Sequence, residues 1–433
     1  MSGAFRIAKT PRWLAADARA LGAPGDAQGF ARVDILIDQG RIAAVTPAGV
    51  QDYGETPRLP LAGRIALPAF VDAHTHLDKG HIWRRAPNPT GDFPGAIQTV
   101  TADRAANWSA EDVAARMEFS LRCAYARGTR AIRTHLDSVG PQADISFPVF
   151  AAARERWKGR IELQASPLFG VDVMFEPGHM QTIERNVEAH GSKLLGAVTY
   201  MIPRLQEALD ALFALAERRG WDLDFHVDET ADPAARTLGA IADTALRRKF
   251  PGAILVGHCC SLARQDDRAR EETIDKVVRA GIAVVSLPMC NMFLQDRHPS
   301  RTPRWRGVTA LHELKAAGAL TMIASDNTRD PFYPHGDMDM LEVWREGVRI
   351  LHLDYPYADW ADAVAAAPAR ALRLDPPRLA AGEAADLILT QARDFTELFS
   401  RPQADRVVIR NGASIDAAAP HYAQLDFLEG LAP

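Results

Sequence analysis

Short apolar runs followed by amphipathic stretches recur along the middle of the chain. Most of these runs are continuously apolar, as expected of parallel strands that are buried on both faces. The predicted strands are Arg64–His74, Ala131–Leu136, Ile161–Pro167, Leu195–Tyr200, Leu223–Val227, Ala253–Gly257, Ala283–Ser286 and Leu320–Ala324. Eight alternating strand–helix units predict a (β/α)8 (TIM) barrel, and a doubly wound open sheet is the alternative that the same number of strands allows.

Two of the predicted helices have clear ends. Ser109 is placed to cap one of them, with Glu111 and Asp112 in its first turn. Pro203 is expected to open another helix, which Gly220 ends.

The two ends of the chain follow a different pattern. Residues 33–45 alternate apolar and polar positions on either side of a Gln39-Gly40 turn, which predicts a β-hairpin. Two more apolar runs, Ala385–Leu389 and Arg406–Arg410, lie near the other end. Because chain termini often lie close together, both ends are expected to form one small β-sandwich domain.

The predicted fold is therefore α/β, a (β/α)8 barrel with a small β-domain built from both chain ends. Residues 1–66 and 375–433 are expected to form the two parts of the β-domain. Residues 67–374 are expected to form the barrel.

Composition excludes several classes of partner. The chain has 433 residues, of which 47% are hydrophobic and 24% charged, ordinary values for a globular protein. Its 50 Lys and Arg against 55 Asp and Glu give a net charge of −5, which offers no general attraction for nucleic acid or an anionic membrane. Four cysteines are too few for a disulfide framework, and the first twenty residues lack the apolar core of a signal peptide. We expect a cytoplasmic enzyme that acts on a small molecule.

A pair of histidines ends the first barrel strand. His74 and His76 are two residues apart, so in a strand both imidazoles point to the same side. Two neutral imidazoles on a rigid strand make half of a zinc or iron site. The alternative is that they are simply two polar residues at a strand end.

Four more polar residues follow later strands in the same way. His226 and Glu229 come at the end of the fifth strand, His258 ends the sixth, and Asp326 follows the eighth. A carboxylate such as Glu229 can accept a proton from a water and later return it. Taken singly, these residues have ordinary explanations: a solvated loop charge, a core histidine and a helix cap. Together they mark the carboxyl ends of barrel strands, where (β/α)8 enzymes place their catalytic groups.

Four stretches of sequence carry a resemblance to a known family. They are His74–Asp78 (HTHLD), Arg133–Asp137 (RTHLD), His226–Glu229 (HVDE) and Asp326–Pro334 (DNTRDPFYP). With the histidine of the sixth strand, they resemble the amidohydrolase superfamily over nearly the whole chain, and more narrowly its bacterial cytosine deaminase branch. The resemblance implies a barrel flanked by a small β-domain, hydrolysis of a C–N bond and a homo-oligomer.

The resemblance also implies a role for each residue. The implied metal ligands are His74, His76, His226 and Asp326. Asp326 also belongs to the implied catalytic set, with Glu229 as the proton carrier and His258 as the group that holds the attacking water or the tetrahedral intermediate. Zn²⁺ and Fe²⁺ both suit three imidazoles and one carboxylate. One ion is expected, because the carboxylated lysine of two-metal relatives has no counterpart in Leu195–Tyr200, and Lys193 lies before that strand.

Two positions depart from cytosine deaminases and concern the substrate. Leu168 stands where those enzymes have a glutamine that contacts the pyrimidine, and Asn327 stands where they have a second acid. The Asp-Asn-x-Arg-Asp run is also similar to the branch that hydrolyses N-isopropylammelide, although that branch lacks the glutamate found here at Glu229. A pocket without the amide would leave polar groups of cytosine unpaired, so a related but different ring is expected.

Lys79, Trp83 and Phe332 complete the candidate substrate-binding residues. Lys79, His81 and Trp83 follow the first strand and either line the pocket or form a simple surface loop. The polar segment 296–306, after the seventh strand, is a candidate lid.

The leading hypothesis is a metal-dependent hydrolytic deaminase that releases ammonia from an amino-substituted N-heterocycle, cytosine-like or related. The alternative is a hydrolase of a cyclic amide or of an N-alkylamino heterocycle, and the released product distinguishes the two. A non-catalytic metal-binding protein is the third possibility, since a fold does not fix a function. The presence of Glu229 and His258 beside all four implied ligands argues against it.

Overall fold

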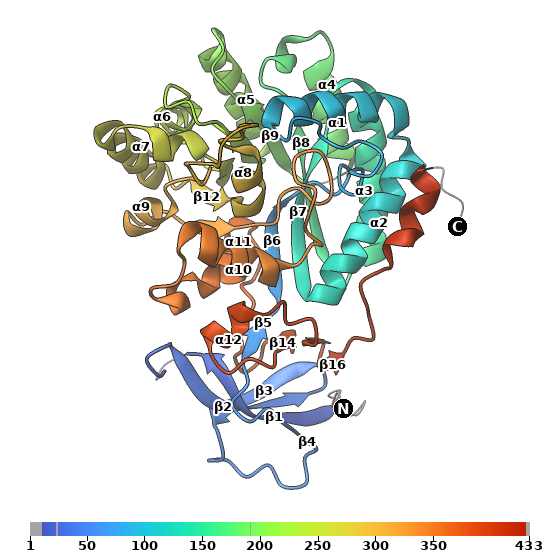
Figure 1. Cartoon of the computed structure of the whole chain (residues 1–433), viewed down its shortest axis with the longest axis vertical. Helices are drawn as coiled ribbons and strands as arrows, with labels where there is room; N and C mark the ends of the chain where they lie inside the picture. The colour runs from blue at the N-terminus through green and yellow to red at the C-terminus, as the bar shows by residue number, and fades with distance from the viewer. Residues whose placement is uncertain (1–10, 23–24, 191, 430–433) are drawn as a thin grey trace.

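The structure is a computed structural model that describes residues 11–22, 25–190 and 192–429. Residues 1–10, on which half of the signal-peptide interpretation rested, lie outside this part of the chain. Figure 1 shows two lobes, a larger one of strands surrounded by helices and a smaller one of strands that contains the first residues drawn. None of the described helices combines the length and the apolar character that a membrane-spanning segment requires.

Two parallel sheets form the centre of the larger lobe. One has the strand order β6-β7-β8 and the other the order β13-β12-β11-β10-β9. Their bounds are β6 (Phe70–Thr75), β7 (Thr129–Asp137), β8 (Glu162–Leu168), β9 (Leu194–Thr199), β10 (Asp222–Val227), β11 (Ile254–His258), β12 (Ala283–Ser286) and β13 (Thr321–Ile323). These strands confirm the predicted ones to within three residues at each end, with one exception. The predicted strand Arg64–His74 is divided, because β5 (Ala66–Pro68) pairs with a strand of the smaller lobe.

The two parallel sheets meet at both of their edges through isolated parallel bridges. One bridge joins Gly170, just beyond the end of β8, to Val198 within β9. The other joins Thr75 to Asp326, where the Asp326 amide donates to the His74 carbonyl over 2.9 Å. All eight strands therefore follow in chain order, without the reversal of order that defines a doubly wound sheet.

Helices follow most of the strands and cover the outside of the sheets (Figure 1). The larger ones are α1 (Phe93–Asn107), α2 (Ala110–Arg127), α3 (Ala143–Trp157), α4 (His179–His190), α5 (Leu205–Arg219), α6 (Thr237–Arg248), α7 (Asp267–Arg279) and α10 (Met340–Leu351). The shorter ones are α8 (Pro288–Leu294), α9 (Leu311–Ala316), α11 (Ala366–Ala371) and α12 (Phe395–Ser400). Ser109 caps α2 as predicted, since its hydroxyl accepts from the Asp112 amide over 3.2 Å. Gly220 ends α5 as predicted, but that helix starts two residues after Pro203.

The smaller lobe is made of two four-stranded sheets from both ends of the chain. The first has the order β3-β2-β1-β4 and the second β16-β15-β14-β5. Their remaining bounds are β1 (Arg12–Leu21), β2 (Phe30–Asp38), β3 (Arg41–Pro47), β4 (Arg58–Pro60), β14 (Leu387–Leu389), β15 (Val407–Arg410) and β16 (Ala413–Ser414). The predicted hairpin is confirmed as β2 and β3.

A shared apolar core holds these two sheets together. Ile35 and Ile37 of the first sheet lie in one buried cluster with Leu387 and Ile409 of the second. Trp13 of β1 adds a hydrogen bond from its indole nitrogen to the Gly412 carbonyl over 2.8 Å. The sequence did not predict β1, because a bulge between Ala15 and Ala18 breaks the alternation, and Asp17 there has a φ of 59°.

Gly128 is the point where a helix of the larger lobe meets the smaller lobe. It caps α2 with a φ of 96°, and a Cβ there would lie 2.6 Å from Ile388 of β14. Gly220 caps α5 in the same way with a φ of 65°, but no atom of the described residues lies within 4 Å of its Cβ position.

We predict that Gly220→Ala lowers the free energy of unfolding by about 1 kcal/mol, the cost of a left-handed alanine. Gly128→Ala should lower it by about 2–4 kcal/mol, because overpacking against Ile388 adds to the backbone cost. Urea denaturation of the two variants measures the difference. Equal losses would show that the contact between the lobes tolerates the extra methyl group.

Candidate functional site

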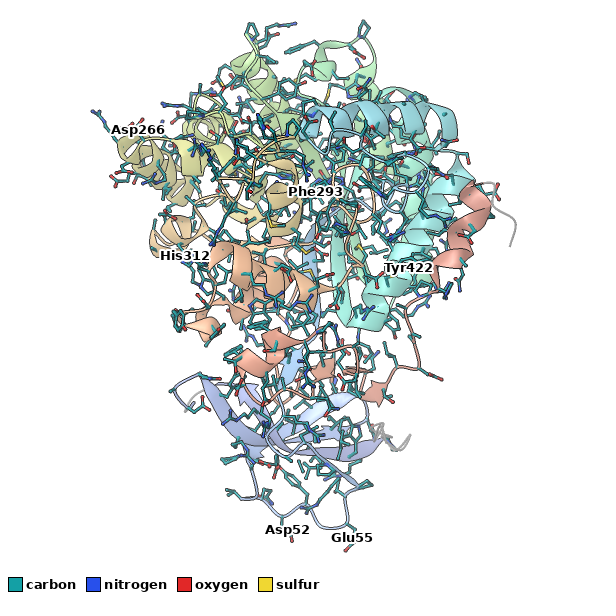
Figure 2. All side chains as sticks on the ribbon, in the orientation of Figure 1. Asp52, Glu55, Asp266, Phe293, His312 and Tyr422 are labelled. Carbon is teal, nitrogen blue, oxygen red and sulfur yellow. The ribbon has the colours of Figure 1, made fainter. Side chains whose placement is uncertain are left out.

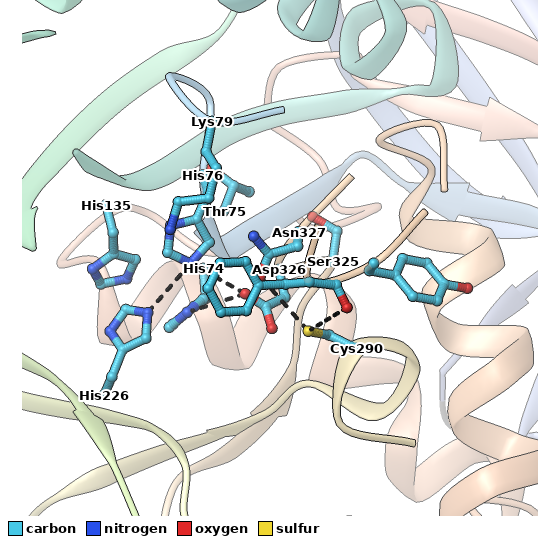
Figure 3. Close-up of polar contacts among 12 residues, drawn as sticks. His74, Thr75, His76, Lys79, His135, His226, Cys290, Ser325, Asp326 and Asn327 are labelled. Carbon is cyan, nitrogen blue, oxygen red and sulfur yellow. Dashed lines mark hydrogen bonds and ion pairs between the residues drawn. The ribbon is translucent and has the colours of Figure 1, made fainter. Parts of the chain in front are cut away.

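Five of the predicted site residues meet at the carboxyl ends of the parallel strands. His74 lies in β6 and His76 just after it, His226 lies in β10, His258 ends β11, and Asp326 follows β13. All five side chains are buried. Figure 3 shows His74, His76, His226 and Asp326 facing one another, with His135 beside them.

The side chains of His74, His76, His226 and Asp326 lie within a few ångströms of one another. The Asp326 Oδ1 atom lies 3.2 Å from His76 Nε2 and 3.6 Å from His74 Nε2. The His76 and His226 Nε2 atoms are 3.3 Å apart. One group of possible ligand atoms within 4.8 Å of one another comprises His74, His76 and Asp326. The arrangement has the three imidazoles and one carboxylate that a zinc or ferrous site uses.

Several polar atoms of this cluster make no hydrogen bond within the described residues. Among the described residues, neither ring nitrogen of His74 and neither carboxylate oxygen of Asp326 has a hydrogen bond, although all four atoms are buried. Buried polar atoms are nearly always paired, so an unpaired group of this size calls for a ligand. A divalent cation bound by these donors would satisfy the nitrogen lone pairs and the carboxylate together, and the residues fit such an ion.

The charge states of the cluster also suit a cation. Burial, followed by nearby positive groups, holds the pKa values of His74, His76 and His226 well below 6.5, so the rings are neutral and their lone pairs are free. Burial raises the pKa of Asp326 to about 7, which means that its ionised form needs a compensating positive charge. Burial lowers the pKa of His258, but the Glu229 and Asp326 carboxylates outweigh that effect and raise it above the usual value.

The backbone is strained at three of the strand ends that build the site. Asp228, His258 and Asp326 have φ values of 46°, 68° and 62°, in the left-handed region that non-glycine residues seldom adopt. Such residues cost on the order of 1–3 kcal/mol each and concentrate at functional sites. At each of these three positions the backbone turns sharply at the end of a strand, next to the residues that face the site.

Glu229 lies beside His258 at the edge of this cluster. Its Oε1 atom is 3.3 Å from His258 Nδ1, and its side chain is 10% exposed. Asn291 of α8 lies against both, with its Nδ2 atom 2.9 Å from Glu229 Oε1 and 3.0 Å from His258 Nδ1. The sequence did not single out Asn291, because it lies on a helix and no spacing pattern connects it to the strand ends.

His135 is a second residue whose place the sequence did not predict. Its ring lies 4.2 Å from that of His74 and 4.5 Å from that of His226, and the three form another possible ligand group. Its Nε2 atom is 3.7 Å from Asp224 Oδ1, and Arg133 Nη1 lies 2.9 Å from Asp224 Oδ2. The sequence did carry a signal for His135, because it lies near the carboxyl end of β7, just as His74 lies near the carboxyl end of β6.

Four of the candidate substrate-binding residues are buried: Lys79, Leu168, Asn327 and Phe332. Lys79 is buried, so the surface-loop alternative is wrong there, and its Nζ atom lies 3.1 Å from Asp137 and 4.8 Å from the centre of the Phe332 ring. Asn327 is also buried, and its amide donates to Asp330 over 2.8 Å. Leu168 ends β8, and its side chain is buried.

The remaining candidates differ in how far they are buried. Trp83 is half-buried, and its amide donates to the Arg329 carbonyl over 2.8 Å, whereas His81 beside it is buried. Cys259 and Cys260, which follow His258, are free and buried. Lys193 is exposed at the amino end of β9, whereas the cluster lies at the carboxyl ends of the strands. In the candidate lid, the amide of Trp305 donates to Asp296 over 3.2 Å, and its movement stays a prediction.

Comparison with known proteins places the chain among amidohydrolases. The model of a family described as "Amidohydrolase family" matches residues 162–416. A pterin deaminase from Rhizobium rhizogenes strain K84 is 53% identical over 404 residues, which cover 93% of this chain and 92% of that protein.

Two solved structures are similar to the whole molecule. The 5-methylcytosine deaminase from Klebsiella pneumoniae with 5-fluorocytosine has a TM-score of 0.82 at 25% identity, covering 94% of this chain and 98% of that one. The N-isopropylammelide isopropylaminohydrolase from Burkholderia multivorans has a TM-score of 0.75 at 27% identity, with the same coverage.

The packing of Gly257 against His74 gives a test of the metal site. A Cβ on Gly257 would lie 2.8 Å from His74 Cε1, so we predict that Gly257→Ala displaces the ring and weakens Zn²⁺ binding by about 10- to 100-fold, as loss of a supporting contact does in other sites. Gly239→Ala is the matched control, because the nearest atom to its Cβ position is 3.9 Å away. Titration against a chromogenic chelator measures both affinities. Unchanged affinity in Gly257→Ala would remove His74 from the ligand set.

Proposed function

Since the chain belongs to the amidohydrolase family, in its cytosine deaminase-like branch, we propose that it is a metal-dependent deaminase of pterins. The observation that carries the proposal is the buried group of His74, His76, His226 and Asp326, in which the His74 ring nitrogens and the Asp326 oxygens make no hydrogen bond within the described chain, with Glu229 at its edge. Support for a pterin ring comes from the relative that is 53% identical over nearly the whole chain. The proposed reaction takes a 2-amino-4-oxopteridine and water to the 2,4-dioxo ring and ammonia.

The proposed metal ligands are His74, His76, His226 and Asp326, and one ion, Zn²⁺ or Fe²⁺, fits their donor set. When bound, a divalent cation supplies Lewis acidity that lowers the pKa of a water toward 7. Glu229 is the nearby carboxylate that can accept a proton from that water.

We assign the proton transfers to Glu229. It takes one proton from the attacking water and gives it to the ring nitrogen beside the amino-bearing carbon, which makes that carbon more electrophilic. The oxygen then bonds to the carbon, and His258 stabilises the negative charge that develops on the oxygen. A second proton from the oxygen reaches the amino group through Glu229, the C–N bond breaks, and ammonia leaves.

We propose that Leu168, Asn327, Phe332, Lys79 and Trp83 line the pocket for the ring. Lys79 and Phe332 lie against each other, so a flat ring in this pocket would meet an aromatic surface next to a cation. An apolar side chain at Leu168 has no group to pair with the amide edge of cytosine, which favours a different heterocycle.

A second candidate is release of an alkylamine from an N-alkylamino ring. The similarity to the N-isopropylammelide hydrolase over 94% of the chain favours it. The same attack on a ring carbon serves both reactions, and the amine product distinguishes them.

Two structural proposals go with this function. We propose that the two parallel sheets, joined at both edges, work as one (β/α)8 barrel. We also propose the division into residues 1–66 and 375–433 for a β-sandwich and 67–374 for the catalytic barrel.

We predict that the Zn²⁺- or Fe²⁺-loaded protein releases one ammonia per pterin consumed. Glu229→Gln should lower kcat by about 10²- to 10⁴-fold with KM changed only a few-fold, because proton transfer acts in the transition state. Glu55→Gln, at the far tip of the smaller lobe (Figure 2), is the matched control and should leave both constants unchanged. Near-normal turnover by Glu229→Gln would refute the assignment, and an alkylamine product from N-alkylamino rings alone would favour the second candidate.

The identity of residue 168 generates a separate prediction about the ring. Wild type should have a higher kcat/KM for pterin than for cytosine. Leu168→Gln should lower kcat/KM for pterin by about 10- to 100-fold and raise kcat/KM for cytosine. The reason is that the buried glutamine amide pairs with cytosine and is left unpaired when pterin is bound. Parallel ammonia assays with both substrates measure the ratio. An unchanged ratio would place Leu168 outside the substrate pocket.

A further inference from the structure

Asn291 is the one polar side chain among those described that bonds to both Glu229 and His258. It lies in α8, directly after β12, and is fully buried. Its Nδ2 atom is 2.9 Å from Glu229 Oε1 and 3.0 Å from His258 Nδ1. A buried amide that contacts two reacting groups at once restricts the protonation of both.

The orientation of the Asn291 amide follows from its neighbours. An ionised carboxylate only accepts hydrogen bonds, so the NH₂ group must face Glu229. Turning the amide over would place its oxygen 2.9 Å from the carboxylate oxygen, a closer contact between two acceptors than the 3.3 Å that separates this carboxylate oxygen from His258 Nδ1. Asn291 Oδ1 makes no hydrogen bond within the described residues, so no other contact favours the reversed orientation.

This orientation determines where the proton lies on neutral His258. Because Asn291 Nδ2 donates, His258 Nδ1 must accept, and the ring proton then sits on Nε2. His258 Nε2 is buried and makes no hydrogen bond within the described chain. It therefore presents an N–H to the interior of the site, where the oxygen that attacks the substrate must be stabilised.

Without Asn291 the opposite tautomer would be favoured. His258 Nδ1 lies 3.3 Å from Glu229 Oε1, so a proton on Nδ1 would bond directly to that carboxylate. Nε2 would then present a lone pair to the site, and Glu229 would lose part of its ability to accept a proton.

We propose that Asn291 is a positioning residue that holds His258 in its Nε2–H tautomer and keeps Glu229 free to carry protons. The inference rests on the proposed deaminase function. Contacts of the residues near Asn291 hold α8 in place. Gln295, one turn later, donates to the Glu229 carbonyl over 3.2 Å. Cys290, the preceding residue, lies 3.6 Å from Asn327 Oδ1 through its sulfur (Figure 3).

Two variants of nearly the same size separate this role from simple packing. Asn291→Leu removes the donor, and we expect kcat to fall by about 10- to 100-fold with KM changed only a few-fold. Asn291→Asp places a second carboxylate beside Glu229 and favours a proton on His258 Nδ1, so the fall should be at least as large as in Asn291→Leu. If packing alone were involved, the isosteric aspartate would be the milder change. A milder effect of aspartate would overturn the proposal.

A spectroscopic measurement tests the tautomer without relying on activity. In the Zn²⁺-loaded protein labelled with ¹⁵N-histidine, the His258 signals are those that disappear in His258→Gln. At the alkaline end of the titration, where the ring is neutral, we expect a proton on Nε2 in wild type and a shift toward Nδ1 in both Asn291 variants. Met292→Ala, on the exposed neighbouring position of α8, is the matched control and should retain the wild-type signals and kcat.

The outcomes distinguish failure of this inference from failure of the proposed function. A wild-type protein that deaminates no pterin but has His258 protonated on Nε2 would contradict the function and leave the tautomer assignment standing. A proton on Nδ1 of neutral His258 in wild type would overturn the inference whatever the activity. Zinc content equal to wild type in both variants shows that the metal site has remained intact.

Discussion

Asp326 is an acid buried among neutral histidine rings, and the energetic cost of its charge shapes the whole site. Burial raises its pKa to about 7, and neither of its oxygens has a hydrogen bond within the described chain. An ionised carboxylate in such surroundings is strongly unfavourable unless a positive charge compensates it. His74, His76 and His226 are neutral for the same reason, because burial disfavours their charged forms. A divalent cation among these four side chains would compensate the charge of the carboxylate. It would also accept the lone pairs of the neutral rings.

The architecture brings these residues together where the two parallel sheets meet. The bridge between Thr75 and Asp326 joins β6 to the end of β13, so the contact that links the sheets also sets the distance between ligands. Asp72 strengthens this junction by accepting from the Ser325 amide over 3.2 Å. The left-handed backbone at His258 and Asp326 then turns each side chain toward the interior. The resulting strain persists because the sheets on either side determine the backbone path.

Much of this arrangement followed from the sequence. Apolar strands at regular spacing predicted the eight parallel strands, and the polar residues at the ends of the first, fifth, sixth and eighth strands predicted which side chains would meet. Asn291 could not be predicted in this way, because its role depends on how the fold places α8 beside Glu229 and His258. The strand β1 was not predicted, because its bulge at Asp17 interrupts the alternation of apolar and polar positions that marks a strand. His135 followed the same rule as His74, but the sequence gives no sign of which of several strand-end histidines lies nearest the others.

Anomalous diffraction from crystals of the metal-loaded protein would show whether these four side chains bind a single ion. Data collected on either side of the zinc and iron absorption edges identify the element and its position. The account predicts a single strong peak within bonding distance of His74, His76, His226 and Asp326, with Glu229 and His258 outside that distance. A peak bound by His135 in place of Asp326, or two peaks in the cluster, would contradict it.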